Sequence, residues 1–229
     1  MEYSERAIDK ELDELLPELP AIALDGPKGV GKTETCRRRA GSVVALDVFV
    51  ADPERITRIT PPVLVDEWQL APSSWDVVRR AVDDGAPAGS FLLTGSSTPL
   101  AKAPGHSGAG RIVSLRMRPM SFPERNLENP TVGLGELLGG GARIAGESGL
   151  GLADYAEEIT RSGLPGIRGL GERARRLQLD GYLTRITRRV LDGDGEGMAP
   201  RGESLGNWLR AYAAATSTTA AFEVIRDAA

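Results

Sequence analysis

A glycine-rich segment near the N-terminus has the residue types and spacing to bind a phosphate chain. It reads GPKGVGKT and matches G-x-x-x-x-G-K-[ST] at every fixed position. Glycines let the backbone turn its N–H groups toward an anion, and the N-terminus of a following helix adds a favourable dipole. We therefore expect ATP to be bound by Gly26, Pro27, Lys28, Gly29, Val30, Gly31, Lys32, Thr33 and Glu34.

Two residues of this segment have defined expected roles. Lys32 would reach the β- and γ-phosphates as a point charge, and the Thr33 hydroxyl would ligate Mg²⁺. Lys28 would either touch phosphate or lie in solvent. The competing interpretation of the whole motif is a glycine-rich turn that matches by chance, which a preceding strand and a following helix make less attractive.

Two adjacent acids follow an apolar run at residues 62–68, PVLVDEW. In an open α/β sheet the ligand lies at the carboxyl ends of the strands, where these acids would emerge. Asp66 would hold Mg²⁺, and Glu67 would act as general base on the attacking water. Taken alone, such a pair is often a solvated turn, and its position one strand after the glycine-rich segment favours the catalytic interpretation.

Hydroxyl residues end a further apolar run, SFLLTGSS at residues 90–97. Thr94 or Ser96 could lie between the two sites above and contact water or the γ-phosphate, or this could be an ordinary strand end. Arg111 begins the next expected strand, at residues 111–117. It could serve as an arginine finger in its own chain or in a neighbouring subunit, or be a surface arginine.

The alternation of apolar strands and helices predicts an α/β fold with a parallel sheet and helices on both faces. Expected strands cover residues 21–26, 43–48, 62–68, 90–97 and 111–117, with helices at 3–16, 32–40, 51–59 and 74–84. We predict a nucleotide-binding domain at residues 1–125, a glycine-rich linker at 126–150 and a helical region at 151–229.

The helical region has two features that could serve a partner. Residues 168–190 contain seven arginines and two acids, which would suit nucleic acid or simply a solvated helix face. Residues 204–228 predict two helices around a Thr/Ser-rich turn, the outline of a helix-turn-helix or of any αα-hairpin.

Bulk composition excludes several classes of protein. The 229 residues are 41% hydrophobic and 26% charged with a net charge of −4, which indicates a globular chain and argues against a strongly basic nucleic-acid binder. A single cysteine allows no intrachain disulfide and favours a reducing, cytoplasmic location. No apolar stretch is long enough to predict a membrane span or membrane partner.

With these motifs in hand, the chain resembles a bacterial family of AAA-superfamily predicted ATPases, which pair a P-loop domain with a C-terminal domain of unknown function. The resemblance rests on GPKGVGKT, PVLVDEWQLAPSSWDVVRRAVDD, GSFLLTGSSTP, GRIVSLRMRPMSFPE, DYAEEITRSGLPGIR and GYLTRITRRV. It implies a P-loop fold with an additional strand between the P-loop strand and the VLVDE strand. It also implies Lys32, Thr33, Asp66 and Glu67 as site residues, Ser96 as a sensor and Arg111 as a finger.

The chain departs from that family at two places. The connection after the second strand is short, near residues 47–51, and the helical region stops at residue 229 where the family continues. By that comparison the chain is truncated at its C-terminus, as a fragment, a shortened gene product or a divergent short form.

The combined prediction is Mg²⁺-dependent ATP hydrolysis, with a homo-oligomer suggested because AAA-type ATPases often complete their sites between subunits. One alternative is a slow ATP-dependent switch that acts through the C-terminal helices on DNA or a protein partner. Another is a small-molecule kinase, which is disfavoured because residues 98–110 contain no arginine for a lid.

Overall fold

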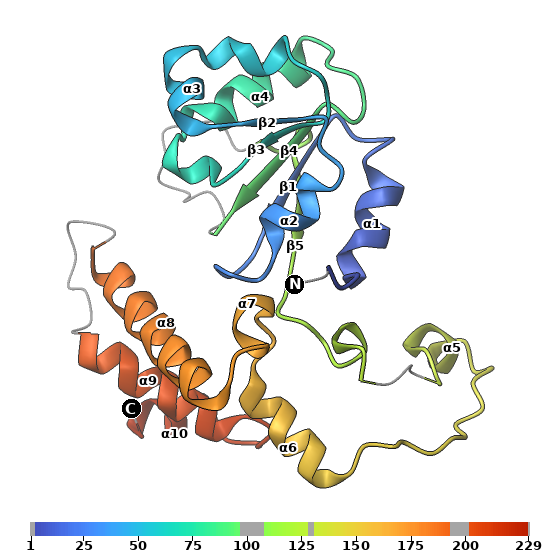
Figure 1. Cartoon of the computed structure of the whole chain (residues 1–229), viewed down its shortest axis with the longest axis vertical. Coiled ribbons are helices and arrows are strands. Elements are labelled where there is room, and N and C mark those ends of the chain that lie inside the picture. Colours follow the sequence, from blue (N-terminus) through green and yellow to red (C-terminus); the bar gives the residue numbers. More distant parts are fainter. Residues whose placement is uncertain (1–2, 97–107, 128–130, 193–201, 229) are drawn as a thin grey trace. The chain divides into compact units, whose positions relative to one another are not determined.

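The computed structural model describes residues 3–96, 108–127, 131–192 and 202–228. The chain divides into two compact units, residues 1–168 and 169–229. Unit 1 contains the sheet, and the described part of unit 2 is helical (Figure 1). Among the described residues, no helix is both long enough and apolar enough to cross a membrane.

Unit 1 is built on a five-stranded sheet in which every pairing is parallel, as the sequence predicts. The strand order is β2-β3-β4-β1-β5. β4 therefore lies between the strand before the glycine-rich loop and the strand before the acid pair, which confirms the additional strand implied by the resemblance. The strands are β1 (Ala21–Asp25), β2 (Ser42–Val44), β3 (Val63–Val65), β4 (Phe91–Gly95) and β5 (Val113–Arg116).

Helices cover both faces of this sheet (Figure 1). The first face packs on α3 (Leu46–Ala51), the 3₁₀ turn η1 (Pro53–Thr57) and α4 (Ser73–Asp83). Its core includes Ala21, Ala23, Val63, Val65, Phe91 and Leu93 from the strands, with Phe49, Ile56, Trp75, Val77 and Val78 from those helices. Residues alternate across a strand, so Ile22, Leu24, Leu64 and Leu92 face the other side, where α1 (Ala7–Leu15) and α2 (Lys32–Arg37) lie.

The central strands are buried along their whole length, which explains why they read as continuous apolar runs. Every residue of β1, β3 and β4 is buried. Burial on both faces removes the alternation of polar and apolar residues that a half-exposed strand would show. The carboxyl ends of these strands meet at one edge, where Asp25 lies opposite both Gly95 and Arg116 in the register.

The second strand is shorter than the prediction. Residues 43–48 were expected to be a strand, but β2 ends at Val44 and α3 begins at Leu46. β2 pairs only with the three residues of β3, so the chain beyond Val44 has no strand to continue against. Of residues 51–59, expected as a helix, the first ends α3 and only Pro53–Thr57 form the 3₁₀ turn η1, whose Ile56 is buried.

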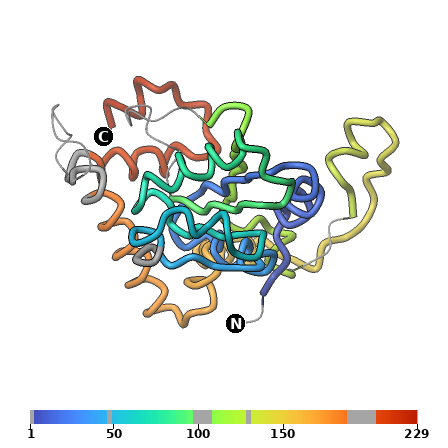
Figure 2. Tube along the Cα trace, turned by 90° about the horizontal axis from the view of Figure 1, so that it is seen from above, coloured from blue at the N-terminus to red at the C-terminus, as the bar shows by residue number. Residues whose placement is uncertain are grey.

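Residues beyond β5 extend unit 1 past the predicted domain boundary. The predicted linker 126–150 contains α5 (Leu134–Leu138), and residues 141–150 form no helix or strand (Figure 2). α6 (Leu152–Arg161) and α7 (Pro165–Arg168) then belong to unit 1. They are held there by buried Glu158, whose carboxylate accepts hydrogen bonds at 3.0 Å from both Arg125, in the 3₁₀ turn η3 (Pro123–Arg125), and Arg168.

Unit 2 contains α8 (Glu172–Asp192), α9 (Gly202–Ala215) and α10 (Phe222–Asp227). Trp208 of α9 contacts Tyr212 of the same helix and Phe222 of α10, with ring centroids 4.3 and 5.9 Å away. The predicted helical region 151–229 is thus divided between the two units.

Candidate functional site

The glycine-rich loop joins the end of β1 to the start of α2, as the motif requires. Gly26 has φ +152°, and a Cβ there would lie 2.3 Å from the carbonyl oxygen of Met117. Gly31 has φ +110° and directly precedes Lys32, the first residue of α2. Both positions need glycine, because residues with a side chain rarely adopt these backbone angles. Position 26 also has no room for a Cβ atom.

Lys32 lies inside this loop with a side chain that is almost fully buried. Its ammonium donates hydrogen bonds to the carbonyl oxygens of Gly26 at 2.8 Å and Pro27 at 3.0 Å. Burial lowers the pKa of Lys32 below its usual range, against the opposing effect of the charges on Glu67, Asp66 and Asp25. The loop therefore holds a partly desolvated cation beside three acids, where an anionic phosphate chain could replace the carbonyl partners.

The Thr33 hydroxyl and Asp66 form the arrangement expected of a Mg²⁺ site. Thr33 Oγ1 donates to Asp66 Oδ1 at 2.8 Å, and Thr94 Oγ1 donates to the same oxygen. Lone pairs of the Thr33 hydroxyl stay available while its proton points to Asp66. A carboxylate and a hydroxyl are hard oxygen donors of the kind that Mg²⁺ prefers, so these residues fit the metal that the sequence predicts.

Glu67 follows Asp66 in a left-handed conformation, with φ 51° and ψ 46°. This region is uncommon for a residue other than glycine, and strained residues of this kind cluster at functional sites. The Glu67 N–H donates to Thr94 Oγ1 at 3.2 Å. Thr94 therefore orients both acids, accepting from the backbone of one and donating to the side chain of the other.

The Glu67 carboxylate is held by a residue that the sequence analysis did not select. Gln69 Nε2 donates to Glu67 Oε2 and also to Ser96 Oγ, the latter at 3.1 Å. Thr94 and Ser96, treated as alternatives from sequence, are thus both at the site. In the sequence, only an amide side chain two residues after Glu67 could have indicated that Gln69 belongs to the site.

Arg111 is not brought to this edge. It precedes β5, and its guanidinium pairs with Asp83 at the end of α4, with Nε 2.8 Å from Oδ1. The loop follows the carboxyl end of β1, parallel to β5, so the length of β5, about 13 Å, separates Arg111 from the site. Within one chain, this geometry favours the surface-arginine alternative over a finger. Pro27, Lys28 and Glu34 are exposed around the loop.

Asp25, the last residue of β1, is a further acid at this edge that the sequence analysis missed. It is buried, and its Oδ1 has no hydrogen-bond partner among the described residues. Burial raises its pKa to about 6, although the charges of Arg116 and Lys32 act in the opposite direction. In the sequence, Asp25 looks like an ordinary polar residue at the end of an apolar strand. Only its burial in the folded protein distinguishes it from such a residue.

The raised pKa of Asp25 predicts a pH-dependent gain in stability on replacement by asparagine. The folded protein holds this proton up to about pH 6, whereas the unfolded chain loses it near the ordinary aspartate pKa of 3.8. Stability contributed by the bound proton is therefore lost as pH rises through 6. We expect Asp25→Asn to raise the free energy of unfolding by about 1–2 kcal/mol at pH 8, and the gain to vanish near pH 4.

Urea unfolding across this pH range measures the effect, with Glu11→Gln at an exposed position of α1 as the control. A loss of stability in Asp25→Asn at pH 8 would contradict the prediction.

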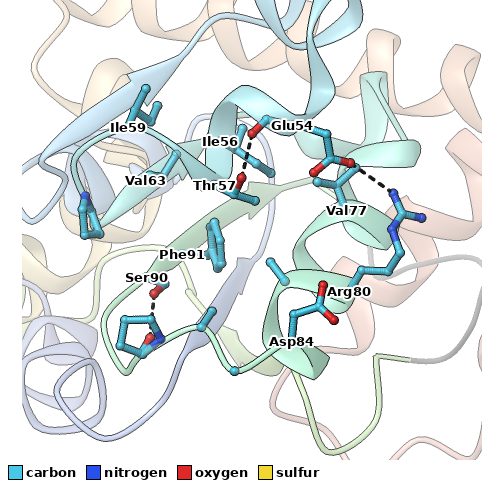
Figure 3. Close-up of a pocket in the computed structure, with 15 residues that line it drawn as sticks. Glu54, Ile56, Thr57, Ile59, Val63, Val77, Arg80, Asp84, Ser90 and Phe91 are labelled. Atoms are coloured by element: carbon cyan, nitrogen blue, oxygen red, sulfur yellow. Dashed lines mark hydrogen bonds and ion pairs between the residues drawn. The ribbon is translucent and has the colours of Figure 1, made fainter.

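A separate cavity of about 520 Å³ lies at the opposite edge of the sheet, where β3 and β4 begin (Figure 3). Its walls include the apolar side chains of Ile56, Val77 and Phe91. Glu54 and Arg80 lie near its rim and pair with each other at 3.8 Å. The cavity contains none of the predicted site residues.

The comparison with known families agrees with this geometry. Residues 18–126 match the family model of the AAA domain. The match covers just under half of the chain, begins after α1 and ends after η3. It supports an AAA-type P-loop ATPase domain in the stretch that holds all five strands, and it suggests nucleotide binding. No curated protein matches the chain.

Proposed function

We propose that the AAA domain binds ATP with Mg²⁺ and hydrolyses it to ADP and phosphate. The observation that carries the proposal is the convergence of two motifs. The Thr33 hydroxyl is hydrogen bonded to Asp66 at 2.8 Å, and Glu67 follows Asp66 directly. A chance glycine-rich turn would not predict a hydroxyl and an acid pair, 33 residues apart, at one edge of the sheet.

Each residue has a role that follows from its chemistry. Lys32 and the N–H groups of the loop would bind the β- and γ-phosphates, while Thr33 and Asp66 would hold Mg²⁺. Bound Mg²⁺ supplies positive charge that offsets the charge on the phosphate oxygens. Glu67 would accept a proton from water as the water oxygen bonds to the γ-phosphorus. The bond from that phosphorus to the bridging oxygen breaks, and ADP leaves with the electron pair.

The contacts of Glu67 support a positioned base. Gln69 fixes its carboxylate and links it to Ser96, the predicted sensor. A loose surface acid would lack these partners. Ser96 would report the γ-phosphate to Glu67 through Gln69, since one amide contacts both side chains.

The site as described is not completed by Arg111 from the same chain. An arginine finger from a neighbouring subunit, and therefore a homo-oligomer, remains part of the proposal. Arg116 of β5 lies at this edge, opposite Asp25 in the register.

The described side chains of α8 do not support the alternative of a DNA-linked switch. In the part of α8 whose side chains the structure describes, the arginines at 173, 175, 176 and 185 lie on different sides of a helix with 3.6 residues per turn. They form no single basic face of the kind that would track a phosphate backbone. A cytoplasmic hydrolase remains the proposal that the site geometry favours.

Removal of Mg²⁺ tests the proposal. Phosphate release from ATP would be measured in the presence of Mg²⁺ and again with excess EDTA. We expect EDTA to lower turnover on the order of 100-fold or more, since charge on the leaving phosphate is then uncompensated, and re-added Mg²⁺ to restore it. Turnover that is unchanged by EDTA would contradict the assignment of Thr33 and Asp66.

A further inference from the structure

Arg6 reaches the phosphate loop from outside the matched AAA domain. It directly precedes α1, and its side chain is only 3% exposed. All three guanidinium nitrogens donate hydrogen bonds: Nη1 to the carbonyl of Val30 at 2.8 Å, Nη2 to the carbonyl of Arg118 at 2.8 Å, and Nε to Glu124 Oε1 at 3.1 Å. Arginine side chains are rarely buried unless they are paired. This one is paired, and one of its hydrogen bonds goes to the phosphate loop.

The contact with Val30 constrains the peptide unit that joins Val30 to Gly31. In a trans peptide, the C=O and the next N–H point in opposite directions. Because Arg6 holds the Val30 carbonyl on its own side of the loop, the N–H of Gly31 is directed to the other side. The same nitrogen, Nη1, lies 3.4 Å from where a Gly31 Cβ would be, so the guanidinium packs against this peptide unit.

The orientation of that peptide matters for anion binding. A phosphate is attracted by N–H groups and repelled by carbonyl oxygens, so a loop that binds it must turn its carbonyls away. Gly31 is flexible enough for the peptide to rotate if the carbonyl is released. Arg6 thus supplies a restraint that the glycine-rich loop cannot supply for itself.

Glu124 fixes Arg6 in place. Its carboxylate accepts hydrogen bonds from the Ala7 N–H at 2.7 Å and the Ser121 N–H at 2.6 Å, besides that of Arg6. Burial would raise the pKa of Glu124, but these hydrogen bonds and the Arg6 charge outweigh burial and lower it. The Glu124 carboxylate is therefore charged at neutral pH, which strengthens its contact with the Arg6 guanidinium.

Contacts of α1 that do not involve the Arg6 side chain also fasten this helix. Arg39, just after α2, donates to Asp9 at 2.8 Å and to Asp13 at 2.6 Å. Tyr3 donates to Asp9 at 2.7 Å. Loss of Arg39 would loosen α1 without removing the donor to Val30, so the chain offers a matched control.

We propose that Arg6 is a positioning residue of the phosphate loop, which holds the Val30–Gly31 peptide with its N–H turned toward the bound phosphates. The proposal rests on the proposed ATP binding. It assigns part of the nucleotide site to the segment before residue 18, where the family match begins.

The test compares Arg6→Gln and Arg6→Lys with Arg39→Gln, in the full chain. We expect Arg6→Gln to weaken ATP binding about tenfold, and the binding of inorganic pyrophosphate by the same factor in a competition assay. The KM for ATP should rise in parallel while kcat stays within about threefold, because Asp66 and Glu67 are untouched. The ATP affinity of Arg6→Lys should lie between those of Arg6→Gln and the wild type. Arg39→Gln should lower the melting temperature but keep ATP affinity within about twofold.

Two outcomes would overturn the proposal: ATP affinity in Arg6→Gln equal to that of the wild type, or an equal loss in Arg39→Gln. Should Arg6→Gln not fold, unchanged affinity in Arg6→Lys overturns it, because the single nitrogen of lysine cannot reach the three acceptors that three separate guanidinium nitrogens contact. The wild type and Lys32→Ala are measured alongside. A wild type that does not bind ATP contradicts the proposed function, whereas normal ATP binding in Arg6→Gln contradicts this inference alone.

Discussion

Lys32→Ala is expected to abolish ATP binding, with affinity reduced at least about 100-fold. The Lys32 ammonium is buried in the loop and bonded only to the carbonyls of Gly26 and Pro27 among the described residues, so phosphates would gain its charge at little cost in reorganisation. Alanine removes that charge and leaves Asp25, Asp66 and Glu67 to repel the nucleotide. Titration of the protein with ATP and Mg²⁺ by calorimetry measures the effect.

Lys28→Ala is the matched control for this prediction. Lys28 belongs to the same loop but is exposed, so its loss should change ATP affinity by no more than a few-fold. ATP binding by Lys32→Ala at wild-type strength would show that the loop is not the nucleotide site.

Glu67→Gln is expected to retain ATP but to lower turnover at least about 100-fold. Glutamine has the shape of glutamate and can still accept a hydrogen bond from Gln69, so the local structure should persist. It cannot take a proton from water at neutral pH. Protein passed through a desalting column after incubation with ATP should therefore carry ATP, where the wild type carries ADP.

Glu34→Gln provides the comparison for the second prediction. Glu34 is an exposed acid in the first turn of α2, next to Thr33, and its replacement should leave turnover within about twofold. If Glu67→Gln hydrolysed ATP at the wild-type rate, a different group would be the general base.

The parts of the site that the sequence predicts are those with local signatures. The glycine-rich loop depends on backbone freedom at fixed spacing, and the acid pair follows a strand that is buried throughout. The loop and the acid pair are each formed by consecutive residues, so each can be recognised in the sequence. The parallel topology then places Thr33 within hydrogen-bonding distance of Asp66. The additional strand followed from the resemblance, and the strand order confirms it.

Other parts depend on contacts between distant residues. Gln69 contacts Glu67 and Ser96 because the chain turns at Glu67, which has a left-handed conformation. Nothing in the sequence around Glu67 predicts that conformation. Arg6 contacts Val30, 24 residues away in the sequence, and Glu124, 118 residues away. These contacts depend on tertiary packing, and no sequence motif predicts them.

The error in the second strand has the same origin. The second strand was overestimated because apolar residues at 43–48 are compatible with either a strand or a buried helix, and only the length of β3 decides between them. Of the two alternatives kept open for Arg111, the strand direction and the ion pair with Asp83 favour a surface arginine over a finger within the same chain.

Steady-state phosphate release by the wild type, set beside Glu67→Gln in the same assay with ATP and Mg²⁺, tests the central claim most directly. We predict sustained release by the wild type and almost none by the variant, with ATP bound to both. Bound ATP without any release by the wild type would contradict hydrolysis and leave a nucleotide-binding switch. Equal release by the two proteins would remove Glu67 from the mechanism.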